Sequence, residues 1–184
     1  MKQFLKKVIL KAALSTKEQA KLNCNDVIVP EGFLPIKQTS DNDIFIAGFP
    51  KSGNTWMQNL IVGIVYGMDT SLLPDKLTQE LIPDLHGKNY YKRFNEVVFF
   101  KTHDLPKKYM KKVIHLVRDG RDAMVSYYAM NRSLKKTMTL KDMIVDGIEI
   151  YPSKWHMHTK QWMENPFNAE IITVRYEDLL NDPF

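Results

Sequence analysis

Short apolar runs and longer stretches of helical periodicity alternate along most of the chain. Four runs are rich in β-branched or aromatic residues and have the length of strands buried on both faces. They cover residues 44–47, 97–100, 113–117 and 171–174. Patterns with a helical apolar face follow three of them, at residues 56–66, 122–130 and 176–180. This alternation predicts an α/β domain of three layers, in which helices flank a central parallel sheet.

The segment between the first predicted strand and its helix has the composition of a phosphate-binding loop. It reads Gly-Phe-Pro-Lys-Ser-Gly-Asn-Thr-Trp over residues 48–56. Glycines let backbone N–H groups approach an anion, and the following helix directs its positive end to the same place. The two glycines and Thr55 match a nucleotide triphosphatase P-loop, but Asn54 replaces its lysine, and Lys51 lies inside the loop instead. The domain is therefore expected to be P-loop-like, with a phosphate ligand handled differently from ATP with magnesium.

A lysine and a histidine follow the second predicted strand at its carboxyl end. Lys101 and His103 are two residues apart, so in an extended chain their side chains face the same way. A neutral imidazole there can take a proton from an attacking hydroxyl, because its unperturbed pKa is ~6.5. The lysine can neutralise charge on a bridging oxygen. A histidine considered alone is more often a polar surface residue, so the nearby phosphate loop is what favours a catalytic base.

The third predicted strand also ends in residues that suit a phosphate. Arg118 presents a planar fork for a phosphate group, and Ser126 can add a hydroxyl donor from the helix that follows. Arg121 and Asp122 have a simpler explanation as local ion pairs or as the start of that helix. We therefore expect a second phosphate contact from Arg118 and Ser126.

Composition narrows the class of protein. A chain of 184 residues with 44% hydrophobic residues suits one domain with a real core. The net charge of +5 suits an anionic ligand and does not imply nucleic acid. Cys24 is the single cysteine, which excludes an intrachain disulfide, leaves no material for a zinc cluster and indicates a reducing, cytoplasmic compartment. No metal is expected.

Two segments outside the strand–helix alternation have open interpretations. Residues 1–29 form a separate amino-terminal segment, and residues 1–14 have lysines opposite an apolar helical face. That pattern suits a helix packed on the domain or a frayed terminus, and also weak contact with an anionic membrane surface. No run of about 18 apolar residues exists, so a transmembrane helix is not expected. Residues 69–93 read as an irregular excursion that either shapes a substrate site or simply connects elements.

Three of these segments, in order, resemble the sulfotransferases that use 3′-phosphoadenosine 5′-phosphosulfate (PAPS). Residues 50–56 are similar to the family's 5′-phosphosulfate loop, with asparagine where threonine is usual. Residues 117–128 are similar to its 3′-phosphate motif, including the eight-residue step from Arg118 to Ser126. Lys101-Thr102-His103 is similar to the segment that bears the base in the branch acting on hydroxyls of small molecules.

The resemblance extends over about residues 30–184, which we take as the sulfotransferase domain. Trp155, His158 and Trp162 share a helical face, as in the family's long helix, and a structural aromatic face is their expected role. The Tyr-Glu-Asp-Leu segment at Tyr176 is also similar to the family. The chain stops before the family's Arg-Lys-Gly segment, which helps to hold the 3′-phosphate. The domain is therefore expected to be carboxyl-terminally truncated, either as a fragment or as a reduced form.

The resemblance implies transfer of a sulfuryl group from PAPS to a hydroxyl or amine acceptor by a single in-line displacement. The product would be adenosine 3′,5′-bisphosphate, and no metal takes part. His103 would remove the acceptor proton, while Lys51 and Lys101 would stabilise charge on the leaving oxygen. Trp56 and Tyr176 would contact the adenine. The expected cofactor-binding residues are Lys51, Ser52, Gly53, Asn54, Thr55, Trp56, Arg118, Ser126 and Tyr176.

Two alternatives remain open at this point. One is a truncated, non-catalytic module that binds a nucleotide or a partner, and the other is a P-loop kinase or nucleotide triphosphatase. The latter is disfavoured because Gly53 is not followed by a lysine and no acidic Walker-B strand end is evident. The acceptor is a small molecule of unassigned class, since phenols, alcohols, lipids and amines all suit a partly apolar pocket. The oligomeric state is not predicted.

Overall fold

The computed structural model describes residues 29–134 and 137–181. Contacts between residues divide the chain into two units, Met1–Glu31 and Gly32–Phe184. The fold and the site described below belong to the second unit. The amphipathic pattern predicted for residues 1–14 lies outside the described residues, as does Cys24.

A sheet of four parallel strands forms the centre of the second unit, in the order β4-β2-β5-β6. The prediction of an α/β domain with a central parallel sheet is confirmed. The strands are β2 (Ile44–Gly48), β4 (Phe99–Thr102), β5 (Lys112–Val117) and β6 (Glu170–Arg175). A separate antiparallel pair consists of β1 (Leu34–Pro35) and β3 (Tyr90–Tyr91).

The position of β2 in the middle of the sheet explains why its sequence is continuously apolar. Phe45, Ile46 and Ala47 are all fully buried, because this strand has a neighbour on each side and side chains packed on both faces. By contrast, β6 lies at an edge of the sheet, and Ile172 is 64% exposed. The prediction that this last strand is buried on both faces is therefore wrong for the described residues.

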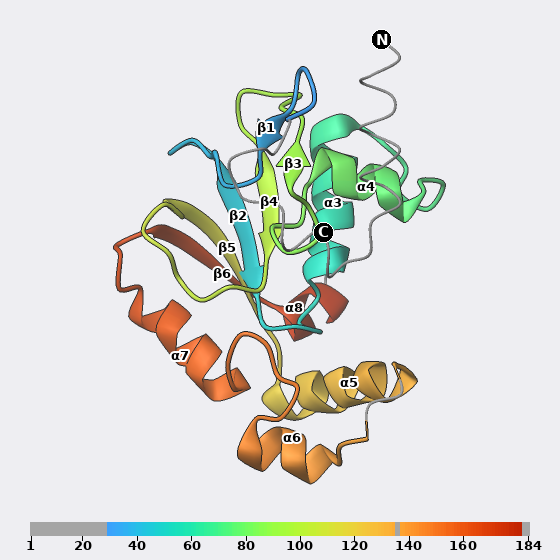
Figure 1. Ribbon diagram of the computed structural model, residues 1–184, viewed down its shortest axis with the longest axis vertical. Coiled ribbons are helices and arrows are strands. Elements are labelled where there is room, and N and C mark those ends of the chain that lie inside the picture. Colours follow the sequence, from blue (N-terminus) through green and yellow to red (C-terminus); the bar gives the residue numbers. More distant parts are fainter. Residues whose placement is uncertain (1–28, 135–136, 182–184) are drawn as a thin grey trace. The chain divides into compact units, whose positions relative to one another are not determined.

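Six helices are described around the sheet. Figure 1 shows α3 and α4 on one side of it, α7 on the other, and α5 and α6 beyond the ends of the strands. The sequence pattern predicted neither α6 nor α4, and α4 lies in the stretch 69–93 that was read as irregular. The helices are α3 (Asn54–Tyr66), α4 (Asp75–Leu81), α5 (Gly120–Ser133), α6 (Leu140–Asp146), α7 (Trp155–Glu164) and α8 (Tyr176–Asn181).

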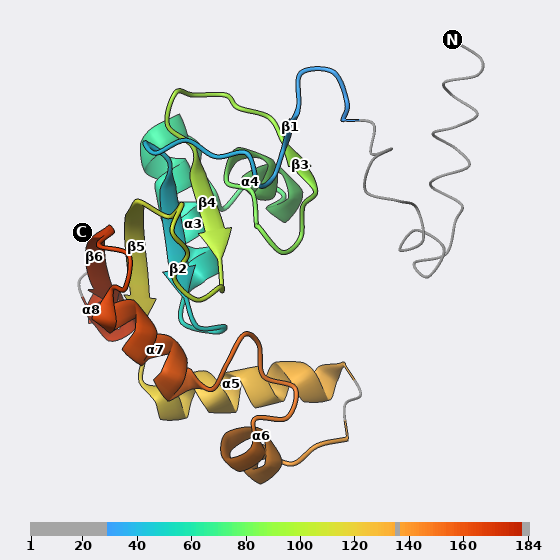
Figure 2. The same ribbon diagram turned by 60° about the vertical axis from the view of Figure 1, so that its left-hand side comes forward.

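The carboxyl ends of the strands face α5. In Figure 2 the arrows of β2 and β5 point toward this helix, and α6 lies beside it. Phe49, just after β2, packs with Tyr127 of α5 and Met143 of α6 in one buried cluster. This cluster fixes α5 next to the loops that follow β2, β4 and β5, where a parallel sheet places its ligands.

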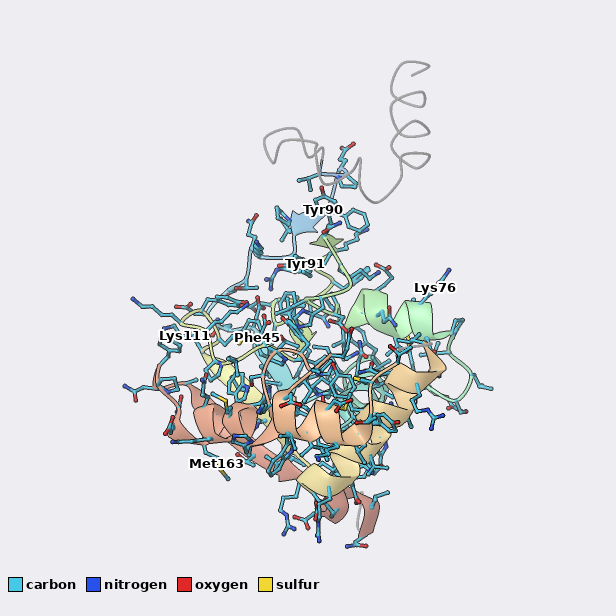
Figure 3. The ribbon with its side chains drawn as sticks, turned by 60° about the horizontal axis from the view of Figure 1, so that its bottom comes forward. Phe45, Lys76, Tyr90, Tyr91, Lys111 and Met163 are labelled. Carbon is cyan, nitrogen blue, oxygen red and sulfur yellow. The ribbon has the colours of Figure 1, made fainter. Side chains whose placement is uncertain are left out.

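Separate apolar clusters cover the two faces of the sheet. Phe45 and Phe100 pack with Trp162 of α7 on one face, while Ile46 packs with Ile61 of α3 on the other. Figure 3 shows Phe45 among the side chains of the sheet, and Met163 of α7 on the outer side of that helix. This arrangement is the predicted three-layer form. Within residues 29–134 and 137–181, no helix is long and apolar enough to cross a membrane.

Candidate active site

The loops at the carboxyl ends of the strands surround a cavity of about 880 Å³. It brings together residues that are far apart in the sequence, from the loop after β2 to the start of α8. Among the predicted site residues, Ser52 does not line it and is buried beneath the loop instead. The predicted residues that line the cavity are Lys51, Gly53, Asn54, Thr55, Trp56, Lys101, His103, Arg118, Ser126 and Tyr176.

The loop after β2 has the backbone shape of an anion site. Lys51 and Gly53 have left-handed backbone angles, with φ of 68° and 96°. Gly53 is the residue before α3, and within the described chain no side chain caps that helix. Its first-turn N–H groups, which have no acceptor within the helix, therefore face the end of the cavity where the loop lies. An anion is the partner that this combination of donors and helix dipole favours.

Two glycines allow the loop to pack closely. A Cβ atom at Gly53 would lie 2.7 Å from Cδ2 of Tyr176. A Cβ atom at Gly48 would lie 2.8 Å from Oδ1 of Asn54 and 3.0 Å from Cβ of Leu116. Both positions would force neighbouring atoms to move. The glycines predicted for close approach to a phosphate therefore also serve close packing within the protein.

Asn54 uses its side chain within the protein. Its Nδ2 donates hydrogen bonds to the carbonyl oxygens of Gly48 (3.4 Å) and Thr102 (3.2 Å). The amide is buried and ties the end of β2 to the end of β4. Because the side-chain donor is used within the protein, Asn54 offers its backbone N–H to a ligand.

Arg118 is held above an aromatic ring. Its guanidinium carbon lies 4.3 Å from the centre of the Tyr176 ring, and its Nη1 donates to the carbonyl oxygen of Lys51 at 2.9 Å. Tyr176 also meets Trp56 edge to face, with ring centres 5.7 Å apart. Arg118 Nε is buried and has no hydrogen-bond partner in the described residues. The arrangement leaves a donor of a fixed guanidinium for a ligand.

Asp119 and Arg121 form the local structure expected at the start of α5. The Asp119 side chain accepts a hydrogen bond from the Arg121 backbone N–H at 2.8 Å and pairs with its guanidinium. Asp122 lies in the first turn of the helix. Ser126 lies further along α5 and lines the cavity. The interpretation of Arg121 and Asp122 as local elements agrees with this geometry.

Lys101 has a partner that the sequence analysis missed. Its Nζ lies 2.9 Å from Oδ2 of Asp84, and both side chains are largely buried. Burial alone would raise the pKa of Asp84, but the hydrogen bonds from the His86 backbone and from Lys101 outweigh it and lower that pKa. The carboxylate is therefore ionised near neutral pH and holds the lysine in place.

The segment around Asp84 runs alongside the end of β4. Leu85 N–H donates to the carbonyl oxygen of Lys101, and Lys101 N–H donates to that of Pro83, each at 2.9 Å. This short parallel pairing sets Asp84 beside Lys101. Residues 85–87 then form a turn, which sets the ring of His86 beside that of His103, with ring centres 6.1 Å apart. The segment read as irregular thus places Asp84 and His86 beside the polar residues at the end of β4. The sequence alone does not indicate this proximity.

His103 has the protonation state of a general base. Its Nδ1 lies 2.8 Å from the carbonyl oxygen of Gly48, which can only accept, so the proton is on Nδ1 and Nε2 keeps its lone pair. Burial lowers its pKa, the bond to Gly48 opposes this shift, and the charge of Lys101 adds to it. The ring is therefore neutral at neutral pH, and it lines the cavity together with Lys101.

Tyr151 and Asp104 form a further polar pair next to His103. Tyr151 donates its hydroxyl to Oδ1 of Asp104 at 2.6 Å, and Lys107 pairs with the other carboxylate oxygen. Burial and the bond to Asp104 raise the pKa of Tyr151. Tyr151 lines the cavity, although neither its sequence position nor its neighbours indicated a role. In the described part of the chain, no group of three or more acidic, histidine or cysteine residues suits a metal ion.

The comparison with known protein families decides the membership of this chain. The family model of the sulfotransferase domain matches residues 41–184. The chain belongs to this family. Sulfotransferase 1E1 of Bos taurus is 29% identical over 160 aligned residues, which cover 75% of this chain and 54% of that protein. Cytosolic sulfotransferase 13 of Arabidopsis thaliana is 28% identical, with coverage of 79% and 52%. This sulfotransferase domain thus spans about half the length of these relatives.

Solved structures share the fold of the sulfotransferase domain. A putative steroid sulphotransferase of Arabidopsis thaliana matches with a TM-score of 0.59 and 20% identity, covering 79% of this chain and 59% of that one. Retinol dehydratase in complex with androsterone and inactive cofactor PAP matches with a TM-score of 0.55 and 22% identity, with coverage of 79% and 57%. The likeness confirms the P-loop-like fold class.

Proposed function

We propose that this protein transfers a sulfuryl group from PAPS to a hydroxyl or amine of a small-molecule acceptor. The observation that carries the proposal is the position of His103. Its imidazole is neutral, carries its lone pair on Nε2, and lines one cavity with an anion-binding loop and Lys101. Membership of the sulfotransferase family supports the same reaction.

The residues present suit a nucleotide with phosphates at both ends. The start of α3 offers backbone N–H groups and the Thr55 hydroxyl for the 5′-phosphate. Arg118 has a buried Nε without a partner among the described residues, and Ser126 lines the same cavity, so these two side chains would hold the 3′-phosphate. Trp56 and Tyr176 offer aromatic surface for the adenine.

The chemistry then divides between the nucleotide and the protein. When bound, PAPS supplies the sulfuryl group. His103 Nε2 removes the proton of the acceptor hydroxyl, and the resulting imidazolium is stabilised by the nearby Asp84 carboxylate. Lys51 and Lys101 place two cations where negative charge grows on the leaving oxygen. None of these roles requires a metal.

The acceptor side of the cavity mixes aromatic and polar groups. Tyr127, Met130 and Tyr151 line it together with His86. The retinol and androsterone complexes of retinol dehydratase suggest an acceptor of similar size. The single cysteine and the cytosolic sulfotransferases of Arabidopsis thaliana among the relatives support a cytoplasmic location.

Sulfate transfer from labelled PAPS to a panel of phenols, alcohols and amines tests this function. His103→Asn is the sharpest variant, since its side-chain amide can still donate to Gly48 while the base is lost. We expect turnover to fall by roughly a hundredfold or more, with binding of adenosine 3′,5′-bisphosphate nearly unchanged. His156→Ala, an exposed histidine on α7, is the matched control. Full turnover in His103→Asn would disprove the base assignment, and bisphosphate binding without transfer to any acceptor would instead identify a nucleotide-binding module.

A further inference from the structure

We propose that His158 and His86 are positioning residues that hold the two peptide groups of His103. The proposal rests on the role of His103 as the base. His158 bonds the carbonyl oxygen of His103, and His86 bonds its backbone N–H. Together with Gly48, which bonds the ring, they would fix both the backbone and the side chain of His103.

The contact from His158 has a defined direction. Its Nε2 lies 3.1 Å from the carbonyl oxygen of His103, which can only accept, so Nε2 carries the proton. His158 is fully buried on α7, and burial lowers its pKa to about 4. Its ring is therefore neutral at neutral pH. Its Nδ1 has no hydrogen-bond partner among the described residues, so the single donor of this ring is committed to His103.

Trp162 makes a similar hydrogen bond to the next residue of the loop, Asp104. It follows His158 by one helical turn, and its Nε1 donates to the carbonyl oxygen of Asp104 at 3.1 Å. Two successive carbonyl groups of the loop after β4 are thus bonded from one face of α7. On the aromatic face that the sequence predicted for this helix, His158 and Trp162 are buried and Trp155 is partly buried. The first two also direct hydrogen-bond donors at the loop after β4.

His86 bonds the other peptide group of His103, at its backbone N–H. The backbone N–H of His103 can only donate, so Nε2 of His86 accepts at 3.3 Å and its proton is on Nδ1. That Nδ1 lies 3.3 Å from the hydroxyl oxygen of Tyr151, which in turn donates to Asp104. The His86 and His103 rings are nearly parallel, at 9°, with centres 6.1 Å apart. The bonds from His103 through His86 and Tyr151 to Asp104 therefore run in one direction, and Nε2 of His86 also lies 3.6 Å from Oδ1 of Asp104.

This arrangement has a reason in the chemistry. A general base works only within hydrogen-bond reach of the proton it removes, and small displacements are costly. His103 lies beyond the last residue of β4, where the ladder of the sheet no longer fixes the backbone. The two histidines supply the missing bonds to that backbone.

Two pairs of variants test the proposal. His158→Gln retains a donor near the position of Nε2, whereas His158→Leu removes it. His86→Gln retains an acceptor, whereas His86→Leu removes it. We expect each leucine variant to lower kcat by roughly tenfold or more with little change in KM or bisphosphate affinity, and each glutamine variant to recover most of that loss. His156→Leu, on the exposed side of α7, is the control for helix α7.

The nitrogen resonances of His103 give a second readout that needs no turnover. In the native chain labelled with ¹⁵N, we expect a protonated Nδ1 and an unprotonated Nε2. Either leucine variant should shift this pattern toward a mixture of tautomers, and His156→Leu should leave it unchanged. His86 is partly exposed, so His86→Leu keeps the test available if His158→Leu does not fold.

The outcomes separate this proposal from the proposed function. Unchanged kcat and an unchanged His103 pattern in folded leucine variants would overturn the positioning role, as would glutamine variants no better than their leucine counterparts. If the native chain transfers no sulfate, the proposed function fails. The resonances of His103 still decide whether the two histidines hold it.

Discussion

The ammonium of Lys101 and the carboxylate of Asp84 lie 2.9 Å apart, with only 13% and 18% of their side chains exposed. The pair joins the end of β4 to a segment that comes earlier in the chain, since Asp84 precedes Lys101 by 17 residues. It places a cation in the cavity without leaving that cation mobile. When His103 is protonated, its charge also lowers the pKa of Asp84.

This pairing predicts coupled effects of substitution at the two positions. Asp84→Asn removes the negative charge that pairs with Lys101, and Lys101→Met removes the positive charge that pairs with Asp84. Each single change should lower the free energy of unfolding by about 1–3 kcal/mol, and the double variant should lose less than the sum. Urea unfolding of the four proteins measures this. Strictly additive losses would show that the pair is not coupled in solution.

The side chain of Asn54 should contribute to the stability of the folded chain, because it links the ends of β2 and β4. Asn54→Ala removes the donor shared by the carbonyl groups of Gly48 and Thr102. We expect a loss of about 1–3 kcal/mol in the free energy of unfolding, because these groups lie in the interior. Asn54→Asp should cost more, since a carboxylate would face two carbonyl oxygens. Thermal unfolding compares the variants, and a native-like midpoint for Asn54→Asp would refute this account.

Tyr176 should affect nucleotide binding through Arg118. Tyr176→Ala removes the ring beneath the guanidinium, whereas Tyr176→Phe retains it. A cation–π contact contributes roughly 0.5–2 kcal/mol, so the alanine variant should bind adenosine 3′,5′-bisphosphate about 2- to 30-fold more weakly. The phenylalanine variant should bind nearly as tightly as the native chain. Equal loss in both variants would assign the effect to the hydroxyl instead.

The buried histidines predict a pH dependence of stability. Burial lowers the pKa of both His115 and His158 to about 4, below the ~6.5 of an unfolded chain. Between these values the unfolded chain binds protons that the folded chain does not, so stability is lost as the pH falls through this window. The loss should be roughly 2 kcal/mol for each histidine between pH 7 and pH 5. His115→Leu should reduce the slope of unfolding free energy against pH, and an unchanged slope would contradict this explanation.

The sequence predicts the parts of this fold that depend on local pattern. The apolar run at β2 and the helical face after it are strong signals, and both elements occur where they were expected. The end of β4 was placed too early. Lys101 and Thr102 are polar, yet they continue the strand because Asp84 and Asn54 supply partners from elsewhere in the fold. Such partners cannot be read from a local pattern.

In the candidate site, too, residues next to a recognisable strand end were predicted, and residues placed by distant contacts were not. His103 and Lys101 were predicted because they follow a strand end, and the structure places both in the cavity. His86 and Tyr151 were missed, since each lies in a connecting segment without a motif. What brings them to His103 is the pairing of residues 83–85 with β4 and the packing of α5 and α6, which are tertiary features.

Calorimetric titration of the chain with adenosine 3′,5′-bisphosphate, compared with ATP and magnesium, tests the central claim most directly. The account predicts metal-independent binding of the bisphosphate that Lys51→Ala and Arg118→Ala each weaken, and that His103→Asn leaves nearly unchanged. His156→Ala serves as the control. A folded chain that does not bind the bisphosphate, or that prefers ATP with magnesium, would contradict the assignment of this cavity as a PAPS site.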